Sequence, residues 1–211
     1  MTAPSRPGPA SVIYLVRHGQ AVDPAEPRRY IGQTDIPLTA EGRRQARNLG
    51  TVFAAIQPDR VVCGDLQRSW ETARAIVKHP RPGKIDAEPI TGLREINLGE
   101  WDGLTMETVK REDPDAWRMR GEDLAGFRPP GGESFADLQN RVVPVFEALA
   151  RETPGRLVIV GHAGVNRVII CRILGMDLKN LFRLGQDPAG ITILVPGPDG
   201  WRVSLLNGCG H

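Results

Sequence analysis

The fold is decided in the stretch Val12-Ile13-Tyr14-Leu15-Val16-Arg17-His18-Gly19. Its first five residues are apolar or aromatic without interruption, which is typical of a strand that is buried on both faces of a parallel sheet. The run ends abruptly at an arginine, a histidine and a glycine. The carboxyl ends of such strands form the edge of the sheet where α/β proteins bind their ligands. The stretch therefore predicts a parallel sheet with a candidate site at the end of this strand.

Beyond this strand, the pattern alternates between helices and further strands. Thr39 has the properties of a helix N-cap, and apolar residues at helical spacing follow it to about Ile56. Further strands are expected at 59–63 and 157–160, further helices at 65–77, 133–152 and 165–174, and a closing hairpin at 191–206. This alternation indicates an α/β three-layer sandwich, in which a mostly parallel central sheet has helices on both faces.

The length of the chain suits one domain. Residues 1–11 are polar and rich in proline, and we expect them to form a flexible N-terminal tail. Residues 12–211 are expected to form a single domain around one good-sized core. Basic and acidic residues are mixed in 99–130, which is predicted to be a cap-like excursion over the site. No apolar run reaches the ~18 residues that span a membrane, so no membrane partner is expected.

The charge and the cysteines argue against several classes of function. The 27 basic and 25 acidic side chains give a formal net charge of +2, which is too small an excess to predict a nucleic-acid partner. Cys63, Cys171 and Cys209 are widely spaced and form no CxxC pair, so neither a disulfide framework nor a thiolate zinc site is expected. These features predict a cytoplasmic protein, and they leave its state open between a monomer and a homodimer.

Two of the four histidines are candidates for chemistry. His18 and His162 each follow the end of an apolar strand and lie beside a glycine. By contrast, His79 precedes Pro80 and His211 is the last residue, and we interpret both as incidental. Because parallel strands end at the same edge of a sheet, the first two histidines are expected to share one site.

Arginines accompany this candidate site. Arg17 directly precedes His18, and its guanidinium disfavours the imidazolium form, so the imidazole is expected to stay neutral and nucleophilic near neutral pH. Arg68 lies near the start of a predicted helix, where free N–H groups also favour anions. The planar donor fork of arginine matches phosphate oxygens. The pattern indicates a nucleophile beside a bound anion. The alternatives are a buried ion pair for Arg17 and an exposed helix position for Arg68.

Glu95 is the candidate for proton transfer. It lies in Leu93-Arg94-Glu95-Ile96, where apolar neighbours favour a partly desolvated carboxyl group. The alternative is an ordinary salt bridge to Arg94 or to another cation. His18, His162 and Glu95 also have the composition of a metal site with two histidines and one carboxylate. The neighbouring arginines oppose that interpretation because cations repel a metal ion, so no metal and no other cofactor is expected.

Four segments resemble a known family. Leu15-Val16-Arg17-His18-Gly19 resembles the signature of the histidine phosphatase superfamily, which includes the phosphoglycerate mutases. The other three follow in that family's order: Gly64-Asp65-Leu66-Gln67-Arg68 with Thr72-Ala73, Leu93 to Gly103, and Val160-Gly161-His162-Ala163-Gly164. Accessory segments at 32–39 and 130–134 are similar to small-metabolite phosphatases of the alpha-ribazole phosphatase kind. The chain departs from the pattern at Gln20-Ala21, Gly64 and Ala163, where relatives often have Glu-Thr, serine and glycine.

The resemblance implies roles for these residues. In a phosphoglycerate mutase-like α/β fold, His18 would be the nucleophile and Glu95 would protonate the leaving group and then activate water. The catalytic and phosphate-binding positions would be completed by Arg17, Arg68, His162 and Ala163. The other implied substrate contacts are Gln20, Arg28, Arg29, Tyr30, Thr34 and Asn166.

The implied function is metal-independent hydrolysis of a phosphomonoester through a phosphohistidine. The substrate would be a small phosphorylated metabolite, with alpha-ribazole 5′-phosphate as the leading candidate. One alternative is phosphoglycerate mutase-type transfer, although the stretch from Gly99 to Pro130 is shorter than the mutase insertion. The other is a non-catalytic phospholigand-binding protein, which would be expected to lack the nucleophile or the acid.

Overall fold

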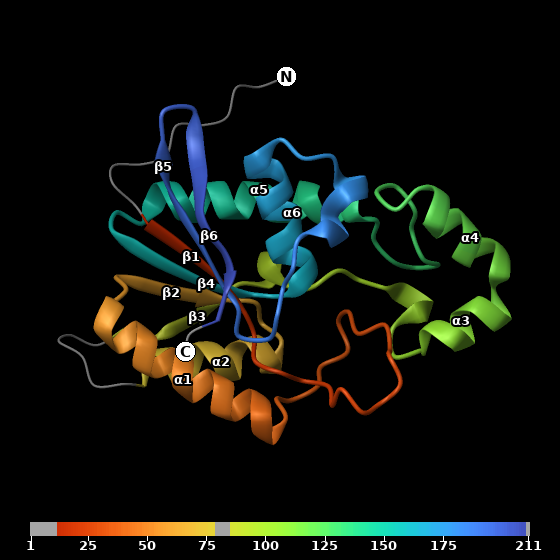
Figure 1. Cartoon of the computed structure of the whole chain (residues 1–211), viewed down its shortest axis with the longest axis horizontal. Helices are drawn as coiled ribbons and strands as arrows, with labels where there is room; N and C mark the ends of the chain where they lie inside the picture. The colour runs from red at the N-terminus through yellow and green to blue at the C-terminus, as the bar shows by residue number, and fades with distance from the viewer. Residues whose placement is uncertain (1–11, 79–84, 210–211) are drawn as a thin grey trace.

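A six-stranded mixed sheet lies at the centre of the computed structural model, which describes residues 12–78 and 85–209 (Figure 1). The strands are β1 (Val12–Arg17), β2 (Arg60–Cys63), β3 (Ala87–Pro89), β4 (Arg156–Gly161), β5 (Ile191–Gly197) and β6 (Gly200–Gly208). In the order β3-β2-β4-β1-β5-β6, the first four strands are parallel and β5 is antiparallel to β1 and β6. The predicted mostly parallel sheet and closing hairpin are confirmed. The predicted tail at 1–11, His79 and His211 lie outside the described residues.

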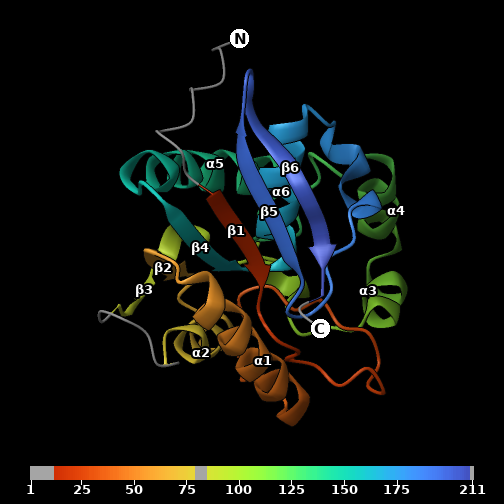
Figure 2. The same ribbon diagram turned by 60° about the vertical axis from the view of Figure 1, so that its left-hand side comes forward.

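Helices cover both faces of this sheet. The four that do so are α1 (Ala40–Ile56), α2 (Gln67–Val77), α5 (Phe135–Glu152) and α6 (Ala163–Leu174). In β1, Ile13 and Leu15 pack into the core with α5 and α6, whereas Val16 packs into the core with α1 and α2. Figures 1 and 2 show α5 and α6 on one side of the sheet and α1 and α2 on the other. Because successive side chains of a strand point to opposite faces, a strand between two helix layers must be apolar throughout. The predicted three-layer sandwich is therefore confirmed.

Local capping explains where two of these helices begin. The Thr39 hydroxyl accepts a hydrogen bond from the Gly42 N–H (3.0 Å) and starts α1 at the predicted position. Ser134 and Asp137 form a capping box at the start of α5, in which each side chain accepts from the other residue's backbone N–H. Such a cap stabilises a helix by about 1 kcal/mol.

The α2 helix begins two residues later than the prediction from Asp65. The Asp65 carboxylate is occupied by Arg94, which donates to it through Nε (2.9 Å) and Nη2 (2.6 Å). The first helical N–H, that of Gln67, donates instead to the Asp35 carboxylate (2.7 Å). A residue from a distant loop therefore caps α2, and this loop is thereby held against the end of β2.

The 99–130 segment lies beside the sheet rather than in either helix layer (Figure 1). It contains the short helices η2 (Gly99–Trp101), α3 (Met106–Glu112) and α4 (Pro114–Glu122). A small separate core of Tyr30, Trp101 and Val109 joins it to the loop that follows β1. The remaining short helices are η1 (Thr91–Leu93) and η3 (Leu178–Arg183). Among the described residues, none of the helices has the length and apolarity needed to cross a membrane.

Candidate active site

The ends of β1 and β4 bring the two candidate histidines together. These strands are parallel neighbours with Arg17 opposite Gly161, and the His18 N–H donates to the Gly161 carbonyl (3.1 Å). The ring centroids of His18 and His162 lie 5.1 Å apart, and both side chains are buried. The topology of the sheet thus places two imidazoles from distant parts of the chain in one site.

His18 is held in the neutral form, in which an imidazole can act as a nucleophile. Its pKa lies well below the ordinary value, first because the ring is buried and then because Arg17 and Arg68 lie nearby. The Nδ1 atom lies 2.7 Å from the Gly19 carbonyl oxygen. A carbonyl oxygen only accepts hydrogen bonds, so Nδ1 carries the proton and Nε2 keeps its lone pair. The ring is therefore a neutral imidazole with one free nucleophilic nitrogen.

Arg17 and Arg68 supply positive charge beside this ring. Arg68 is fully buried and donates to the carbonyls of Gly32 (2.6 Å) and Thr34 (2.9 Å), while Arg17 donates to the Gln186 carbonyl (2.5 Å). Burial lowers the pKa of both guanidinium groups, and the nearby Glu95 carboxylate opposes that shift. Neither arginine takes part in the ion pairs found among the described residues. Two guanidinium charges without a carboxylate partner favour an anion at this place.

Glu95 is buried next to the first turn of α6. Its Oε2 accepts a hydrogen bond from the Gly164 N–H (3.0 Å), and its Oε1 accepts one from the Ile96 N–H (3.0 Å). A Cβ atom at position 164 would lie 2.5 Å from Oε1, so only glycine allows this approach. Arg94 pairs with Asp65 instead, which makes the alternative of a Glu95–Arg94 salt bridge wrong.

The imidazole ring of His162 has no hydrogen-bond partner among the described residues. Both of its ring nitrogens are buried and unpaired, and burial, followed by the nearby His18 and Arg68, places its pKa well below the ordinary value. A buried unpaired polar atom costs about 1–3 kcal/mol and is rare in folded proteins. A Cβ atom at Gly64 would lie 2.8 Å from Nε2, so the departure from serine at this position leaves room for the ring. The unpaired nitrogens indicate a ligand-binding role.

Two adjoining cavities open beside His18 and Glu95, and the buried ring of His162 lines neither of them. The first, which we call the His18 cavity, has a volume of about 420 Å³. Its lining includes Arg17, His18, Gln20, Arg28, Arg29, Arg68, Glu95 and Ala163. The second, which we call the aromatic cavity, has a volume of about 250 Å³ and includes Tyr30, Phe127, Phe135 and Phe182 in its lining. Arg29, Ile31, Glu95 and Ala163 line both cavities, so Glu95 stands at their junction.

Comparison with known proteins fits this geometry. The family model of the histidine phosphatase superfamily (branch 1) matches residues 13–208. This chain belongs to the histidine phosphatase superfamily. The resemblance predicted from the four segments is thereby confirmed.

Relatives of this histidine phosphatase have different substrates in their names. The chain is 35% identical over 182 residues to glucosyl-3-phosphoglycerate phosphatase of Mycolicibacterium vanbaalenii, covering 82% of this chain and 78% of that protein. It is 27% identical over 176 residues to adenosylcobalamin/alpha-ribazole phosphatase of Escherichia coli, covering 83% and 85%. A mycobacterial glucosyl-3-phosphoglycerate phosphatase solved with VO3 has a TM-score of 0.81 and 32% identity, covering 93% of this chain and 98% of that one. The predicted phosphoglycerate mutase-like α/β fold is confirmed.

The expected substrate contacts of this histidine phosphatase divide into two groups. Gln20, Arg28 and Arg29 line the His18 cavity, and Tyr30 lines the aromatic cavity. Thr34 lines neither cavity, and its carbonyl holds Arg68 instead. Asn166 is fully buried and donates to the Gln186 side chain (3.0 Å) behind the site. Direct substrate contact through these last two side chains stays a prediction, as it does for His162, because none of the three lines a cavity among the described residues.

Three residues at the site were missed in the sequence. Gln186 holds Arg17 through its carbonyl, and Arg120 and Arg167 line the aromatic cavity. Arg167 lies four positions after Ala163, so helical spacing from that position could have pointed to it. Arg120 lies in the charge-rich 99–130 segment, where sequence gives no means of separating it from solvated neighbours.

The buried histidines of this histidine phosphatase predict a loss of stability in mild acid. Because the folded state lowers the pKa of both rings, the unfolded chain binds more protons below about pH 6.5. Each ring should lower the free energy of unfolding by up to about 1.4 kcal/mol per pH unit as pH falls, until its own folded-state pKa is reached. Urea unfolding from about pH 7 to about pH 5 measures this slope.

The control for this prediction is the double variant His18→Gln/His162→Gln. Glutamine does not titrate, so the variant should lose less stability than the wild type over the same interval. Equal slopes for the two proteins would show that other groups cause the acid sensitivity. Inorganic phosphate should oppose the effect, because a bound anion favours protonated rings.

Proposed function

We propose that this protein hydrolyses phosphomonoesters of small metabolites through a phosphohistidine at His18. The observation that carries the proposal is the neutral, buried imidazole with a free Nε2, in a cavity that also contains two guanidinium groups without carboxylate partners among the described residues. A neutral imidazole is a nucleophile, and the guanidinium groups favour the phosphoryl group that it would attack. The names of the relatives support the same class of reaction.

The first step transfers the phosphoryl group to the enzyme. Nε2 of His18 attacks phosphorus in line while the bond to the leaving oxygen breaks, and protonated Glu95 gives its proton to that oxygen. The ring gains positive charge in this step, and the Nδ1–H bond to the Gly19 carbonyl stabilises it. Arg17, Arg68 and His162 hold the phosphoryl oxygens, which supplies the positioning on which phosphoryl transfer depends.

The second step returns the enzyme to its starting state. The Glu95 carboxylate takes a proton from water as the water oxygen attacks phosphorus. The bond between Nε2 and phosphorus breaks, inorganic phosphate is released and His18 becomes neutral again. Glu95 lines both cavities, which supports a role for one carboxyl group toward both the alcohol and the water.

We propose that the reaction needs no metal and no cofactor. Two guanidinium groups provide the positive charge that a divalent cation supplies in other phosphatases, and His162 can add a hydrogen bond to a phosphoryl oxygen. Within the described parts of the chain, no group of three or more His, Cys, Asp and Glu side chains is arranged to hold a metal ion.

The aromatic cavity suggests what the leaving group carries. The guanidinium carbon of Arg120 lies 5.8 Å from the Phe182 ring centroid, and that of Arg167 lies 5.2 Å from it. The ion pairs among the described residues include neither arginine. We propose a leaving group that offers either a carboxylate to these arginines or a planar ring to the aromatic wall. Glucosyl-3-phosphoglycerate fits the first description, and alpha-ribazole 5′-phosphate, our leading candidate from the sequence, fits the second.

A panel of phosphomonoesters assayed with and without excess EDTA tests this function. We expect release of inorganic phosphate at the same rate in both conditions, with higher kcat/KM for the two named esters than for simple alkyl phosphates. Activity lost in EDTA and restored by a divalent ion would contradict the metal-free mechanism. Isomerisation of phosphoglycerate that outpaces phosphate release would indicate a mutase, and the absence of any turnover would indicate a binding protein.

The cysteines support the proposed location in the cytoplasm. Cys63 and Cys171 are buried free thiols, Cys209 is an exposed one, and burial raises the pKa of Cys63 to about 12. Free thiols persist in a reducing compartment. We propose a monomer or homodimer whose partner is the small phosphorylated substrate, without a nucleic-acid or membrane partner.

A further inference from the structure

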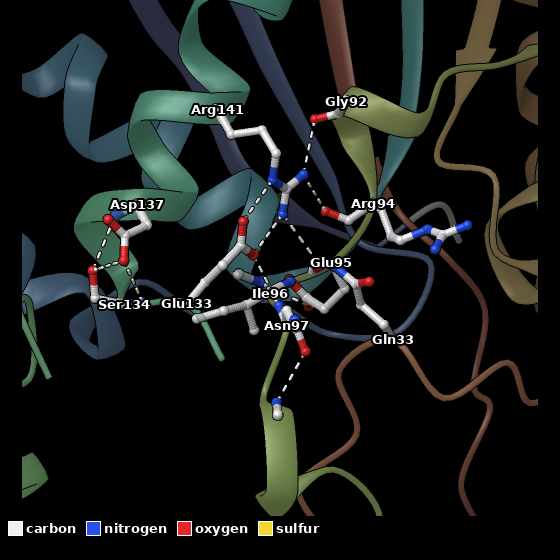
Figure 3. A network of polar contacts seen from close by, with 12 residues as sticks. Gln33, Gly92, Arg94, Glu95, Ile96, Asn97, Glu133, Ser134, Asp137 and Arg141 are labelled. Atoms are coloured by element: carbon white, nitrogen blue, oxygen red, sulfur yellow. Dashed lines mark hydrogen bonds and ion pairs between the residues drawn. The ribbon is translucent and has the colours of Figure 1, made fainter. Parts of the chain in front are cut away.

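A two-residue ion pair lies directly behind the acid. Arg141, on α5, donates to Glu133 through two parallel hydrogen bonds, from Nε to Oε1 (2.8 Å) and from Nη2 to Oε2 (2.8 Å) (Figure 3). Paired bonds of this kind fix the plane of the guanidinium as well as its position. Arg141 lines neither of the two cavities, although Glu133 is part of the wall of the aromatic cavity.

The remaining donors of Arg141 reach the backbone that carries Glu95. Nη1 donates to the carbonyls of Gly92 (3.1 Å) and Arg94 (3.0 Å), and Nη2 donates to the carbonyl of Glu95 itself (3.3 Å). Three carbonyls within four residues therefore converge on one side chain, as Figure 3 shows. Such convergence fixes the path of the chain through the acid.

Glu133 holds the same segment from its other side. Its Oε2 accepts a hydrogen bond from the Asn97 N–H (2.9 Å), and its own N–H donates to the Asn97 carbonyl (2.8 Å). The ion pair thus binds the chain both before and after Glu95. The Gln33 side chain adds one more bond, to the Glu95 carbonyl (3.0 Å).

We propose that Arg141 is a positioning residue that, with Glu133, aims the carboxyl group of Glu95 at the leaving oxygen. The inference rests on the proposed role of Glu95 as proton donor. A misplacement of about 1 Å costs a reaction of this kind about 10²-fold in rate. We call the Arg141–Glu133 pair the clamp. Its hydrogen bonds reach the backbone around Glu95, and among the described residues it makes none with the side chains of His18, Arg17 and Arg68.

The leaving group provides a readout that a general loss of structure would not move. An alkyl phosphate such as β-glycerophosphate expels a strongly basic alkoxide and needs the proton from Glu95. p-Nitrophenyl phosphate expels a stable phenolate and needs that proton far less. A badly aimed acid therefore lowers kcat/KM for the first substrate selectively, whereas partial unfolding lowers kcat/KM for both equally.

The experiment compares kcat/KM for both substrates in Arg141→Gln, Arg141→Lys, Glu95→Gln and the double variant Glu95→Gln/Arg141→Gln. This quantity covers the steps up to release of the alcohol, so it excludes the later hydrolysis of the phosphoenzyme, in which Glu95 also takes part. We expect Arg141→Gln to lose about 10²-fold on β-glycerophosphate and much less on p-nitrophenyl phosphate. Arg141→Lys keeps the charge without the planar fork, so it should restore part of the loss. The double variant should be no slower than Glu95→Gln alone, because two residues that act through one group are not additive.

The matched control is Arg94→Gln. Arg94 also forms a two-bond pair with a carboxylate, Asp65, but its side chain points away from the clamp (Figure 3). This variant should have the same ratio of kcat/KM for β-glycerophosphate to kcat/KM for p-nitrophenyl phosphate as the wild type. Three results would each overturn the positioning role. They are equal losses on both substrates in Arg141→Gln, a loss on β-glycerophosphate in Arg141→Lys that is as large as in Arg141→Gln, and full additivity of Arg141→Gln with Glu95→Gln. If Glu95→Gln itself lowers kcat/KM for both substrates equally, the proton-donor role fails, and the proposed function fails with it at that step.

Discussion

Replacement of His18 by alanine is expected to lower kcat by at least about 10⁴-fold, since removal of the nucleophile from covalent enzymes costs up to about 10⁶-fold. The buried ring has one nitrogen occupied by the Gly19 carbonyl and one left free, and alanine removes the free one. The rate of p-nitrophenyl phosphate hydrolysis at saturating substrate measures the effect. The loss should be as large for this activated ester as for alkyl esters, because every substrate needs the nucleophile.

Trapping the intermediate provides the control for this variant. Wild-type protein quenched during turnover of a ³²P-labelled ester should carry phosphate that is labile to acid and stable to base, as phosphoramidates are. His18→Ala should carry none. Mass spectrometry that places phosphate on a different side chain of the wild type, or residual turnover within about tenfold of it, would contradict the assignment of the nucleophile.

Removal of Arg68 is expected to cost both activity and stability. A single positioned donor contributes about 10²–10³-fold to rate, and a fully desolvated guanidinium should reach the upper end of that range. Arg68→Ala also leaves the carbonyl of the buried Gly32 without its donor, and such a buried unpaired group costs about 1–3 kcal/mol. The carbonyl of the exposed Thr34 loses the same donor but can bond to water. The kcat/KM for p-nitrophenyl phosphate and the free energy of unfolding in urea measure the two losses.

Two variants separate these effects of Arg68. Arg68→Lys keeps the charge but cannot bond both carbonyls and a phosphate oxygen, so much of the kinetic loss should remain. Arg44→Ala removes an exposed arginine that pairs with Glu41 on α1. It should change the free energy of unfolding by no more than about 0.5 kcal/mol and kcat/KM by no more than the equivalent factor of about two. A stable Arg68→Ala protein with a kinetic loss below about tenfold would show that this guanidinium does not contact the phosphate.

The sheet and the meeting of the histidines follow from features that sequence carries. Strands buried on two faces must be apolar, and parallel strands must end at one edge, so His18 and His162 were predictable from the runs that precede them. The start of α2 was not, because it depends on Asp35 and Arg94, which approach from other parts of the chain.

The direction in which each side chain points was the least predictable part of the site. Thr34 belongs to a segment that reaches the site, but it contributes a carbonyl while its side chain faces elsewhere. Asn166 is one turn into α6, where helical geometry turns it behind the cavity toward Gln186. A motif shows which segments converge, and only the packing decides which atoms face the substrate.

The position of Glu95 at the junction of the two cavities has a consequence for the fate of the phosphoenzyme. In the proposed mechanism, the departing alcohol and the incoming water compete for one binding position beside the same carboxyl group. An alcohol that lingers there shields the phosphohistidine and can take its phosphoryl group back. The balance between hydrolysis and return of the phosphoryl group to an acceptor thus depends on how long the dephosphorylated alcohol stays in the aromatic cavity. Tighter binding of this product would convert a hydrolase into a transferase without any change to its nucleophile.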